Sequence, residues 1–395
     1  MSEQQTTAVI GLGTMGAGIV EVLAKAGHRV FGIDYDDRAV AGGRERLETS
    51  LDRAVQKGKL NPDERQAVVS RVSFGTDKAV LTGASVIIEA VSEKPELKQA
   101  VFAEIDAHAP ADAILATNTS SLSITSIAAG TTRPDRVIGI HFFNPAPVQP
   151  LVEVIDTVLT DPAVIDRAMS FLQELGKRPI RCGDRAGFIV NSLLVGYLNA
   201  AVRTYADGRI SREQLDAAMV EEAGYPMGPL ALLDMIGIDV GHAVLVRMYD
   251  ETKDRRHAPA PLLTQLLEAG LLGRKTGRGF YDYRSEESVA PVRTPQWASG
   301  EGIAEELVTD YLNDAVRMVE TNYATPDDID AGMSLGCRMP KPFEVLAARG
   351  PRAVLDRQRA IFERTAEPGD RPSALLEALA DAAEPQAALE LLRSR

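Results

Sequence analysis

A strand, a glycine-rich turn, a helix and a second strand can be read from residues 7–34, TAVIGLGTMGAGIVEVLAKAGHRVFGID. Residues 7–11 form a short apolar run, and apolar side chains then recur at helical spacing over residues 14–26, up to Gly27. Residues 29–34 form a second apolar run that ends on an acid. This order predicts the start of a parallel sheet with crossover helices.

The same alternation continues through the first half of the chain. Further strands are predicted at 71–74, 86–91, 114–117, 136–141, 151–156 and 178–181. Helices are predicted at 37–57, 95–108, 123–129 and 163–176. We therefore expect residues 1–184 to form an α/β, Rossmann-like domain with a doubly wound, mostly parallel sheet.

The pattern changes after Asp184, where strand-like runs become rare. Residues 188–205 read as one long apolar helix, and further helices follow to about residue 272. We expect residues 185–283 to form an all-helical domain. Residues 284–300 are rich in Ser, Glu, Pro and Gly, which is typical of a linker.

Residues 301–395 contain a partial repeat of the helical domain. The segment 311–317, YLNDAVR, matches 197–203, YLNAAVR, at an offset of 114 residues. Asp330 falls on Asp216 at the same offset. Chance similarity of two amphipathic helices is the alternative, but the matches persist beyond the first helix. The sequence thus predicts a helical domain in two tandem copies, the second degenerate.

Length, charge and cysteine content narrow the class of protein. A chain of 395 residues favours two or three domains. The net charge of −13, from 43 basic and 56 acidic residues, disfavours nucleic acids and anionic membranes as partners. Cys182 and Cys337 are the two cysteines, so neither a disulfide framework nor a cysteine metal site is expected. Without a signal-like start or an apolar run of roughly 20 residues, we expect a cytoplasmic protein.

The glycine-rich turn is a candidate dinucleotide site. Gly11 permits a tight turn, Gly13 lets a pyrophosphate approach the backbone, and Gly16 lets helix and strand pack closely. Asp34 ends the second strand, where it can bind both ribose hydroxyls and repel a 2′-phosphate. These features favour NAD over NADP, with FAD less favoured and a turn without ligand as the alternative. The candidate cofactor contacts here are Gly11, Gly13, Thr14, Met15, Gly16 and Asp34.

A histidine and an acid occupy neighbouring apolar runs. His141 closes the run 136–141, and Glu153 lies between two valines of the next run. A carboxylate in such a place is costly to bury without a partner. Because a histidine held by a buried carboxylate is typical of a general base or acid, the pair indicates the proton-transfer half of a dehydrogenase. A structural core histidine is the alternative.

Three other polar residues stand out. Ser120 follows a strand, where ligands bind in open α/β sheets, although it could instead cap the next helix. Asn191 lies in an apolar helix and needs a partner, either a ligand or a neighbouring helix. Glu89 is an acid in an apolar strand, and the simplest interpretation is a strand-end charge that reaches solvent.

These residues carry a resemblance to the L-3-hydroxyacyl-CoA dehydrogenase family, also called 3-hydroxybutyryl-CoA dehydrogenases. The matching stretches, which span about residues 7–283, are Gly11–Gly16, Glu89–Glu93 with Lys98, Asn118–Leu122, His141–Pro145, Leu151–Val154, Gly187–Asn191, Gly224–Pro229 and Lys275–Phe280. The resemblance implies a reversible, NAD-dependent oxidation of (S)-3-hydroxyacyl-CoA in fatty-acid metabolism. A short-chain substrate such as 3-hydroxybutyryl-CoA is expected.

The resemblance also implies a role for individual residues. The family's catalytic pair falls on His141 and Glu153, its hydroxyl on Ser120 and its asparagine on Asn191. Family positions near NAD correspond to Glu93, Lys98, Ser120, Asn144 and Lys275. Family positions that contact coenzyme A correspond to Ser50 and Lys57, on a helix that also carries Arg44, Arg46 and Arg53. Ser120 and Asn191 are thereby expected to bind the substrate as well.

The chain also departs from the family. Gln149-Pro150 stands where the family commonly has a Met-Lys-like pair. In the second helical copy, Glu305 replaces Asn191, so this copy is expected to be structural and to pack on the first, in a monomer or a homodimer. Two alternatives stay open: a dehydrogenase of free hydroxy acids, such as sugar acids or carnitine-like compounds, and a non-enzymatic nucleotide-binding or structural protein.

Overall fold

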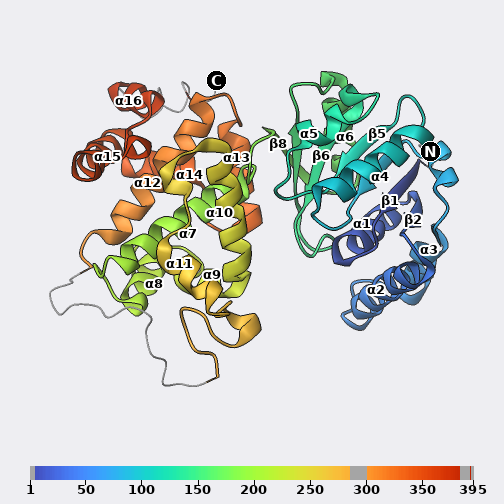
Figure 1. Cartoon of the computed structure of the whole chain (residues 1–395), viewed down its shortest axis with the longest axis horizontal. Helices are drawn as coiled ribbons and strands as arrows, with labels where there is room; N and C mark the ends of the chain where they lie inside the picture. Colours follow the sequence, from blue (N-terminus) through green and yellow to red (C-terminus); the bar gives the residue numbers. More distant parts are fainter. Residues whose placement is uncertain (1–4, 285–299, 383–391, 393–395) are drawn as a thin grey trace. The chain divides into compact units, whose positions relative to one another are not determined.

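The chain folds into two compact units, residues 1–184 and 185–395 (Figure 1). This computed structural model describes residues 5–284, 300–382 and 392. The predicted linker therefore lies almost wholly outside the described residues. The division of the second unit into 185–283 and 301–395 stays a prediction.

The first unit is built on one eight-stranded sheet with the order β3-β2-β1-β4-β5-β6-β7-β8. Its strands are β1 (Thr6–Ile10), β2 (Arg29–Ile33), β3 (Val72–Gly75), β4 (Val86–Glu89), β5 (Ile114–Thr117), β6 (Val137–Phe142), β7 (Leu151–Asp156) and β8 (Arg178–Gly183). Neighbouring strands are parallel except β6 and β7, which are antiparallel. The predicted Rossmann-like, mostly parallel sheet is confirmed.

Helices connect these strands. They are α1 (Thr14–Lys25), α2 (Asp37–Gln56), α3 (Pro62–Ser70), α4 (Pro95–His108), α5 (Ile124–Ala129) and α6 (Pro162–Glu174), with short 3-10 turns η1 (Lys78–Gly83) and η2 (Pro134–Arg136). α3 was not predicted from the sequence. Its apolar stripe is weak because Val68 is its one buried residue. Its signal lies in its start, where Asn61 and Glu64 form a capping box around Pro62.

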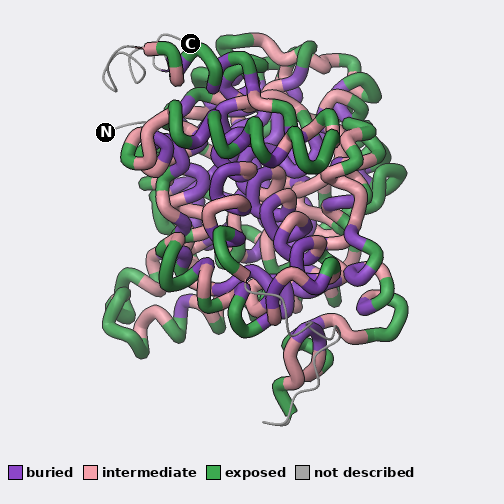
Figure 2. The backbone as a smooth tube through the Cα atoms, turned by 90° about the vertical axis from the view of Figure 1, so that its left-hand side faces the viewer, coloured by how far each residue is buried: buried purple, intermediate pink, exposed green. Residues whose placement is uncertain are grey.

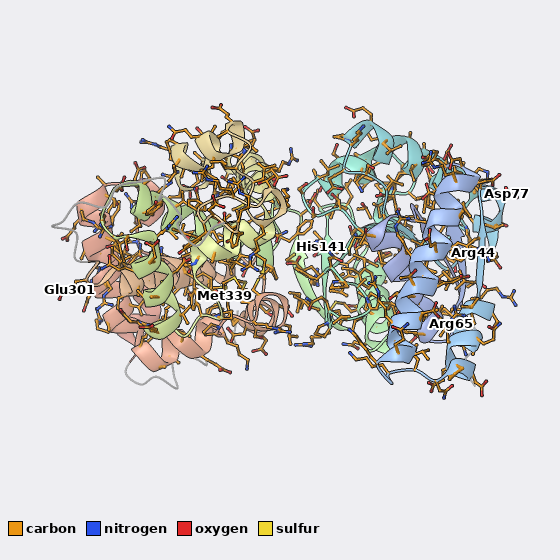
Figure 3. The ribbon with its side chains drawn as sticks, turned by 90° about the horizontal axis from the view of Figure 1, so that it is seen from below. Arg44, Arg65, Asp77, His141, Glu301 and Met339 are labelled. Carbon is orange, nitrogen blue, oxygen red and sulfur yellow. The ribbon has the colours of Figure 1, made fainter. Side chains whose placement is uncertain are left out.

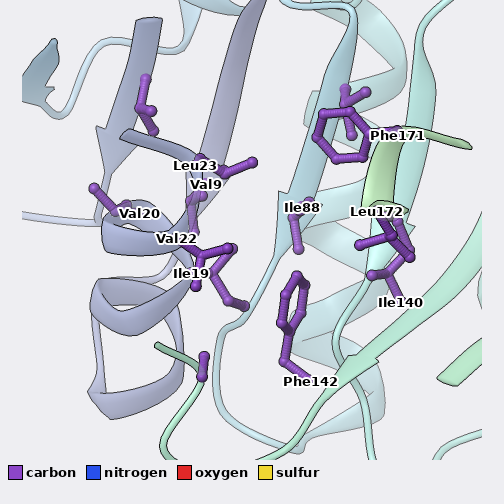
Figure 4. Packing of buried hydrophobic residues seen from close by; sticks show 14 of the residues in the cluster. Val9, Ile19, Val20, Val22, Leu23, Ile88, Ile140, Phe142, Phe171 and Leu172 are labelled. Atoms are coloured by element: carbon purple, nitrogen blue, oxygen red, sulfur yellow. The ribbon is translucent and has the colours of Figure 1, made fainter. Parts of the chain in front are cut away.

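The core of this unit forms where the central strands meet α1 and α6. Val9 of β1, Ile88 of β4 and Ile140 of β6 are fully buried, and they pack in one cluster with Ile19 of α1 and Leu172 of α6 (Figure 4). Strands buried on both faces read as continuous apolar runs, which is why the sequence located them well. This core holds the carboxyl ends of the strands, where the polar residues of interest lie.

Two predicted boundaries were wrong for local reasons. The strand predicted at 86–91 ends at Glu89, because the Val91 N–H donates to the Glu89 carboxylate and not to a neighbouring strand. The helix predicted from residue 188 begins at Val190. Phe188 has φ +48°, in the left-handed region, so a right-handed helix cannot include it.

The second unit is helical in its described residues. Its first series is α7 (Val190–Ala206), α8 (Arg212–Glu221), α9 (Pro229–Ile236), α10 (Ile238–Thr252), η3 (Arg255–His257), α11 (Pro261–Glu268) and η4 (Arg274–Thr276). Its second series is α12 (Ile303–Glu320), α13 (Pro326–Cys337), α14 (Pro342–Arg349), α15 (Pro351–Thr365), η5 (Pro368–Asp370) and α16 (Ala374–Asp381). Buried and exposed residues alternate along the helical chain trace (Figure 2), as amphipathic helices require.

The two helical series share local details besides their order. Asn199 of α7 donates to the carbonyls of Arg256 and Ala258, at 2.7 and 2.9 Å, and accepts from the Ala260 N–H at 2.9 Å. Asn313, which is 114 residues later, donates to the Arg371 carbonyl at 3.2 Å and accepts from the Ser373 N–H at 2.9 Å. Both amides therefore fasten a long helix to the start of the last helix of its series.

No single described helix is both long and apolar enough to cross a membrane. The pair α9 and α10 reaches that length and composition only when taken together, and it bends by 97° at the break.

Candidate active site

The antiparallel pairing of β6 and β7 places His141 directly opposite Glu153. Residues opposite each other in a ladder project their side chains to the same face, and the His141 Nδ1 lies 2.7 Å from the Glu153 Oε2. The Glu153 side chain is fully buried, and that of His141 is 9% exposed; Figure 3 labels His141. An ionised carboxylate only accepts, so a neutral imidazole in this pair carries its proton on Nδ1.

Ser120 lies on the loop that follows β5, the parallel neighbour of β6. Its N–H donates to the Glu93 Oε1 at 2.8 Å, and its hydroxyl lies 3.4 Å from the same oxygen. Asn118 joins the two strand ends, since its Oδ1 accepts from the Phe142 N–H at 2.8 Å. No role of Asn118 was predicted from the sequence. Ser120 and His141 therefore belong to the same carboxyl edge of the sheet.

A buried ion group lies behind this loop. The Lys98 side chain is 1% exposed, and its Nζ lies 2.7 Å from the Glu89 carboxylate and 3.2 Å from that of Glu93. Burial alone raises the pKa of Glu93, but the ammonium of Lys98 and the hydroxyl of Thr119 lower it below its usual value. The interpretation of Glu89 as a charge that reaches solvent was wrong, because Glu89 is fully buried and satisfied by Lys98.

The glycine turn after β1 has the shape that a dinucleotide needs. Gly11 has φ +92°, and a Cβ on Gly16 would lie 1.7 Å from the Gly11 carbonyl oxygen. By contrast, Gly13 is exposed, and a Cβ there would meet nothing within 4 Å. The Asp34 carboxylate, at the end of β2, accepts from the Leu12 N–H at 2.6 Å. This open backbone at the start of α1 fits a pyrophosphate.

Ser50 lines a cavity of about 540 Å³ in the first unit. The cavity is bounded by α1, by α2 and by the loop between β6 and β7. Its lining also includes Thr14, Asn144, Arg46 and Arg53. Lys57 is exposed at the end of α2 and does not line it. Arg44 instead stacks on Phe74, with 5.0 Å between the guanidinium carbon and the ring centre. Of the candidate coenzyme A contacts, the cavity therefore gathers Ser50 and two arginines.

Two candidate residues belong to the second unit. Asn191 is the second residue of α7 and is half-buried. Lys275 lies in η4 and pairs with Asp239, and its side chain is 45% exposed. Their position near Ser120 and His141 stays a prediction.

A nucleotide-type glycine turn and a histidine–carboxylate pair at the strand ends define the chain as a nicotinamide-dependent dehydrogenase. Matches to two protein-family models identify the family of dehydrogenases. The 3-hydroxyacyl-CoA dehydrogenase NAD-binding domain matches residues 6–185, and the C-terminal domain of the same family matches 187–283 and 303–389. The chain therefore belongs to the 3-hydroxyacyl-CoA dehydrogenase family, and it is an NAD-dependent 3-hydroxyacyl-CoA dehydrogenase.

Individual relatives agree with this assignment. A 3-hydroxybutyryl-CoA dehydrogenase of Mycobacterium tuberculosis is 44% identical over 281 residues, which cover 71% of this chain and 98% of the relative. The 3-hydroxyadipyl-CoA dehydrogenase of Escherichia coli is 37% identical over 358 residues, covering 88% of this chain and 72% of the relative. Among solved structures, a 3-hydroxybutyryl-CoA dehydrogenase of E. coli matches with a TM-score of 0.89 and 31% identity, over 96% of this chain and 98% of that one.

Proposed function

We propose that the chain oxidises the C3 hydroxyl of short-chain (S)-3-hydroxyacyl-CoA, such as 3-hydroxybutyryl-CoA, and that His141 is its general base. The bond of 2.7 Å between the His141 Nδ1 and the Glu153 Oε2 carries this proposal. It leaves Nε2 of the ring as the atom that takes the hydroxyl proton. In the reverse direction, the same nitrogen returns the proton.

Glu153 has two tasks in this scheme. Its hydrogen bond fixes the ring orientation, and its charge stabilises the imidazolium that forms when His141 takes the proton. The full burial of Glu153 supports the second task, because a charge acts more strongly where water does not screen it. When bound, NAD supplies the hydride acceptor.

The remaining polar groups bind and orient the ligands. Ser120 and Asn191 hydrogen-bond the reacting oxygen or the acyl carbonyl. Ser50, Arg46 and Arg53, which line the cavity of about 540 Å³, bind coenzyme A, and Lys57 contacts it from outside this cavity. The residues that hold NAD are Gly11, Gly13, Thr14, Met15, Gly16, Asp34, Glu93, Lys98, Ser120, Asn144 and Lys275.

Replacing the base tests the proposal. We expect His141→Ala to lower the kcat for 3-hydroxybutyryl-CoA oxidation by at least about a hundredfold, because general-base catalysis contributes roughly 10²–10⁴. NADH formation followed by absorbance measures this change. His108, which is exposed on α4, offers the matched control: His108→Ala leaves kcat unchanged.

Other outcomes would select another function. Turnover of free hydroxy acids in preference to CoA thioesters would favour a sugar-acid or carnitine-like substrate. NADH binding without turnover of any hydroxyacyl-CoA would favour a nucleotide-binding protein. We also propose that the protein is cytoplasmic. Its acidic charge argues against nucleic-acid and anionic-membrane partners.

A second candidate substrate is 3-hydroxyadipyl-CoA, which ends in a carboxylate. The observation that favours it is the length of the match to the E. coli enzyme of that name, which covers 88% of this chain. Comparing kcat/KM for 3-hydroxybutyryl-CoA and 3-hydroxyadipyl-CoA decides between them. A preference of tenfold or more for the ω-carboxylated thioester, which corresponds to about 1.4 kcal/mol, would replace the first assignment.

We further infer that residues 301–395 are a degenerate second copy of 185–283. The inference is supported by the shared order of four helices, a 3-10 turn and a fifth helix in both helical series, and by the corresponding amides Asn199 and Asn313. The match of the C-terminal family model to 303–389 also supports it. Glu305 is the residue that corresponds to Asn191 in the second copy, and its carboxylate forms salt bridges with Arg349 and Arg357. The second copy therefore supplies no catalytic amide.

The contact between the two helical series predicts what truncation does. The Arg209 guanidinium donates two hydrogen bonds to the Glu306 carboxylate, at 2.8 and 2.9 Å. The Arg256 guanidinium donates one to the Asp314 carboxylate, at 2.7 Å. A fragment that ends at residue 299 exposes this face, together with buried residues such as Tyr197. We expect it to be less stable or to form dimers that the full chain does not form, as sedimentation and thermal unfolding would show. A fragment with unchanged stability and assembly would contradict the inference.

A further inference from the structure

Glu89 is a buried carboxylate near the candidate site, and both of its oxygens accept hydrogen bonds. It ends β4 and is fully buried. Its Oε1 accepts from the Val91 N–H at 2.6 Å and from Lys98 at 2.7 Å, while its Oε2 accepts from the Thr117 hydroxyl at 2.7 Å. A buried carboxylate with such a set of donors is held in one geometry. The hydride and proton transfers proposed above assign no role to Glu89.

Lys98 links Glu89 to a second carboxylate, that of Glu93. Its Nζ lies within 3.2 Å of both Glu89 and Glu93, and its side chain is 1% exposed. Because two carboxylates share one ammonium, the position of Glu93 depends on the position of Glu89.

Glu93 in turn holds the loop that carries the candidate serine. Its Oε1 accepts from the N–H groups of Ser120, at 2.8 Å, and Ser121, at 3.3 Å, and from the Thr119 hydroxyl. Among the described residues, Glu93 is the one carboxylate that accepts from the Ser120 N–H. A path of direct bonds thus runs from Glu89 through Lys98 and Glu93 to the Ser120 backbone.

The other end of this group reaches the nucleotide turn. The Val91 N–H that binds Glu89 belongs to the segment against which Gly11 packs, since a Cβ on Gly11 would lie 2.8 Å from the Ala90 carbonyl carbon and the Val91 nitrogen. Glu89 therefore restrains the wall of the nucleotide turn and, through two ion pairs, the Ser120 loop.

We propose that Glu89 is a positioning residue for the reaction, and that Lys98 acts through Glu93 to hold Ser120 in its catalytic geometry. The proposal rests on the proposed function in one respect, namely that Ser120 binds the substrate. Glu89→Gln keeps the shape of the side chain but places an amide N–H₂ among groups that themselves donate. The substitution also removes the charge that pairs with Lys98, so we expect the loop that carries Ser120 to become more mobile.

A double-mutant cycle tests this path. We expect Glu89→Gln to lower kcat for 3-hydroxybutyryl-CoA about tenfold, since small misplacements of a binding group cost this much or more. In a Ser120→Ala background the same change should lower kcat by less than about twofold, because the effects of residues that act as a unit do not add. Equal losses in both backgrounds would show a general structural effect and overturn the proposal. Glu96→Gln, an exposed acid on α4, is the control with unchanged kcat.

A second measurement is independent of the reaction. Hydrogen exchange of the peptide that covers residues 118–123 should be at least about threefold faster in Glu89→Gln than in the wild type, with exchange in α12 unchanged. Unchanged exchange in this loop would overturn the proposal even if the enzyme turns over its substrate. Faster exchange in a protein without 3-hydroxyacyl-CoA activity would retain the positioning role and reject the proposed function. If Glu89→Gln does not fold, Glu89→Asp, which withdraws the carboxylate by one methylene, takes its place with the same expected results.

Discussion

At the scale of single residues, the chemistry of this chain depends on how buried charges are paired. Glu153 faces His141 across two antiparallel strands, and Glu89 faces Lys98 beside a parallel one. A buried ion stays charged only with a partner, so each pair is held in a narrow geometry. In one pair the partner is an imidazole, which can accept and return a proton, whereas in the other it is a lysine that binds two neighbouring carboxylates.

The charge of Glu153 can be tested apart from its shape. We expect Glu153→Gln to lower kcat by about a hundredfold with little change in the KM for the acyl-CoA. The amide can still bond to Nδ1 but cannot stabilise the imidazolium, and it also allows the wrong ring tautomer. Steady-state kinetics and thermal unfolding of the same preparation separate a catalytic loss from unfolding. A kcat within threefold of the wild type would show that Glu153 is a structural partner only.

The sequence allowed some residues of the candidate site to be predicted and not others. His141 and Glu153 stood out because each is polar within an apolar run. Glu89 stood out for the same reason, but its partner lies nine positions away on the next helix, and spacing alone cannot distinguish a buried ion pair from a strand-end charge. The link between Asn118 and Phe142 depends on two strands being neighbours, which no local pattern encodes.

At the scale of elements, the apolar periodicity predicted the strands and most helices of the first unit. It failed for α3, where polar residues dominate and only the capping box marks the start. It also placed the start of α7 too early, because the left-handed backbone at Phe188 is set by the turn and not by hydrophobicity. Periodicity reports which face of an element is buried, whereas ends are set by caps and backbone angles.

The turn between β1 and α1 offers a matched pair of glycine substitutions. We expect Gly13→Ala to leave the free energy of unfolding within about 0.5 kcal/mol, because its Cβ meets nothing. The same variant should weaken NADH binding at least about tenfold, since the Cβ occupies space that the pyrophosphate needs. Gly16→Ala should instead destabilise the protein by about 1–3 kcal/mol, because its Cβ would lie 1.7 Å from the Gly11 oxygen.

Urea unfolding and NADH fluorescence titration measure both effects. The informative result is the contrast between the two variants. If Gly13→Ala bound NADH as tightly as the wild type, the pyrophosphate would not approach this turn, and the assignment of the cofactor site would need to move elsewhere.

At the scale of the whole molecule, each unit carries its own set of buried charges. In the helical unit these gather around a cavity of about 380 Å³ that both helical series line. Burial alone raises the pKa of Glu306 there, but Arg209 and Arg364 lower it to about 2. Burial raises the pKa of Asp310 to about 7, helped by the nearby Asp370, although Gln358 donates to it at 2.9 Å. The contact between the two helical series therefore contains one acid, Glu306, whose charge is stabilised by arginines, and another, Asp310, whose ionisation is unfavourable.

These opposite shifts predict how stability depends on pH. The folded pKa of Glu306 is below its unfolded value, so its stabilisation is complete above about pH 4.5 and is lost as the pH falls toward 2. The folded pKa of Asp310 is above its unfolded value of 3.8, so the folded state binds more protons between about pH 4 and pH 7. Its contribution to stability therefore falls as the pH rises through that window and is constant above it.

Removing the charge of Asp310 should abolish that loss. We expect Asp310→Asn to raise the free energy of unfolding of the full chain at pH 8, and to raise it by about 2–3 kcal/mol more at pH 8 than at pH 5, since each of the two pH units between 5 and the folded pKa is worth about 1.4 kcal/mol. Asp356→Asn, an exposed acid on α15, is the matched control and should change stability equally at the two pH values. Urea unfolding at pH 5 and pH 8 provides the comparison. A gain of the same size at both pH values would mean that Asp310 ionises normally in the folded chain, and that its carboxylate reaches water through the cavity between the helical series.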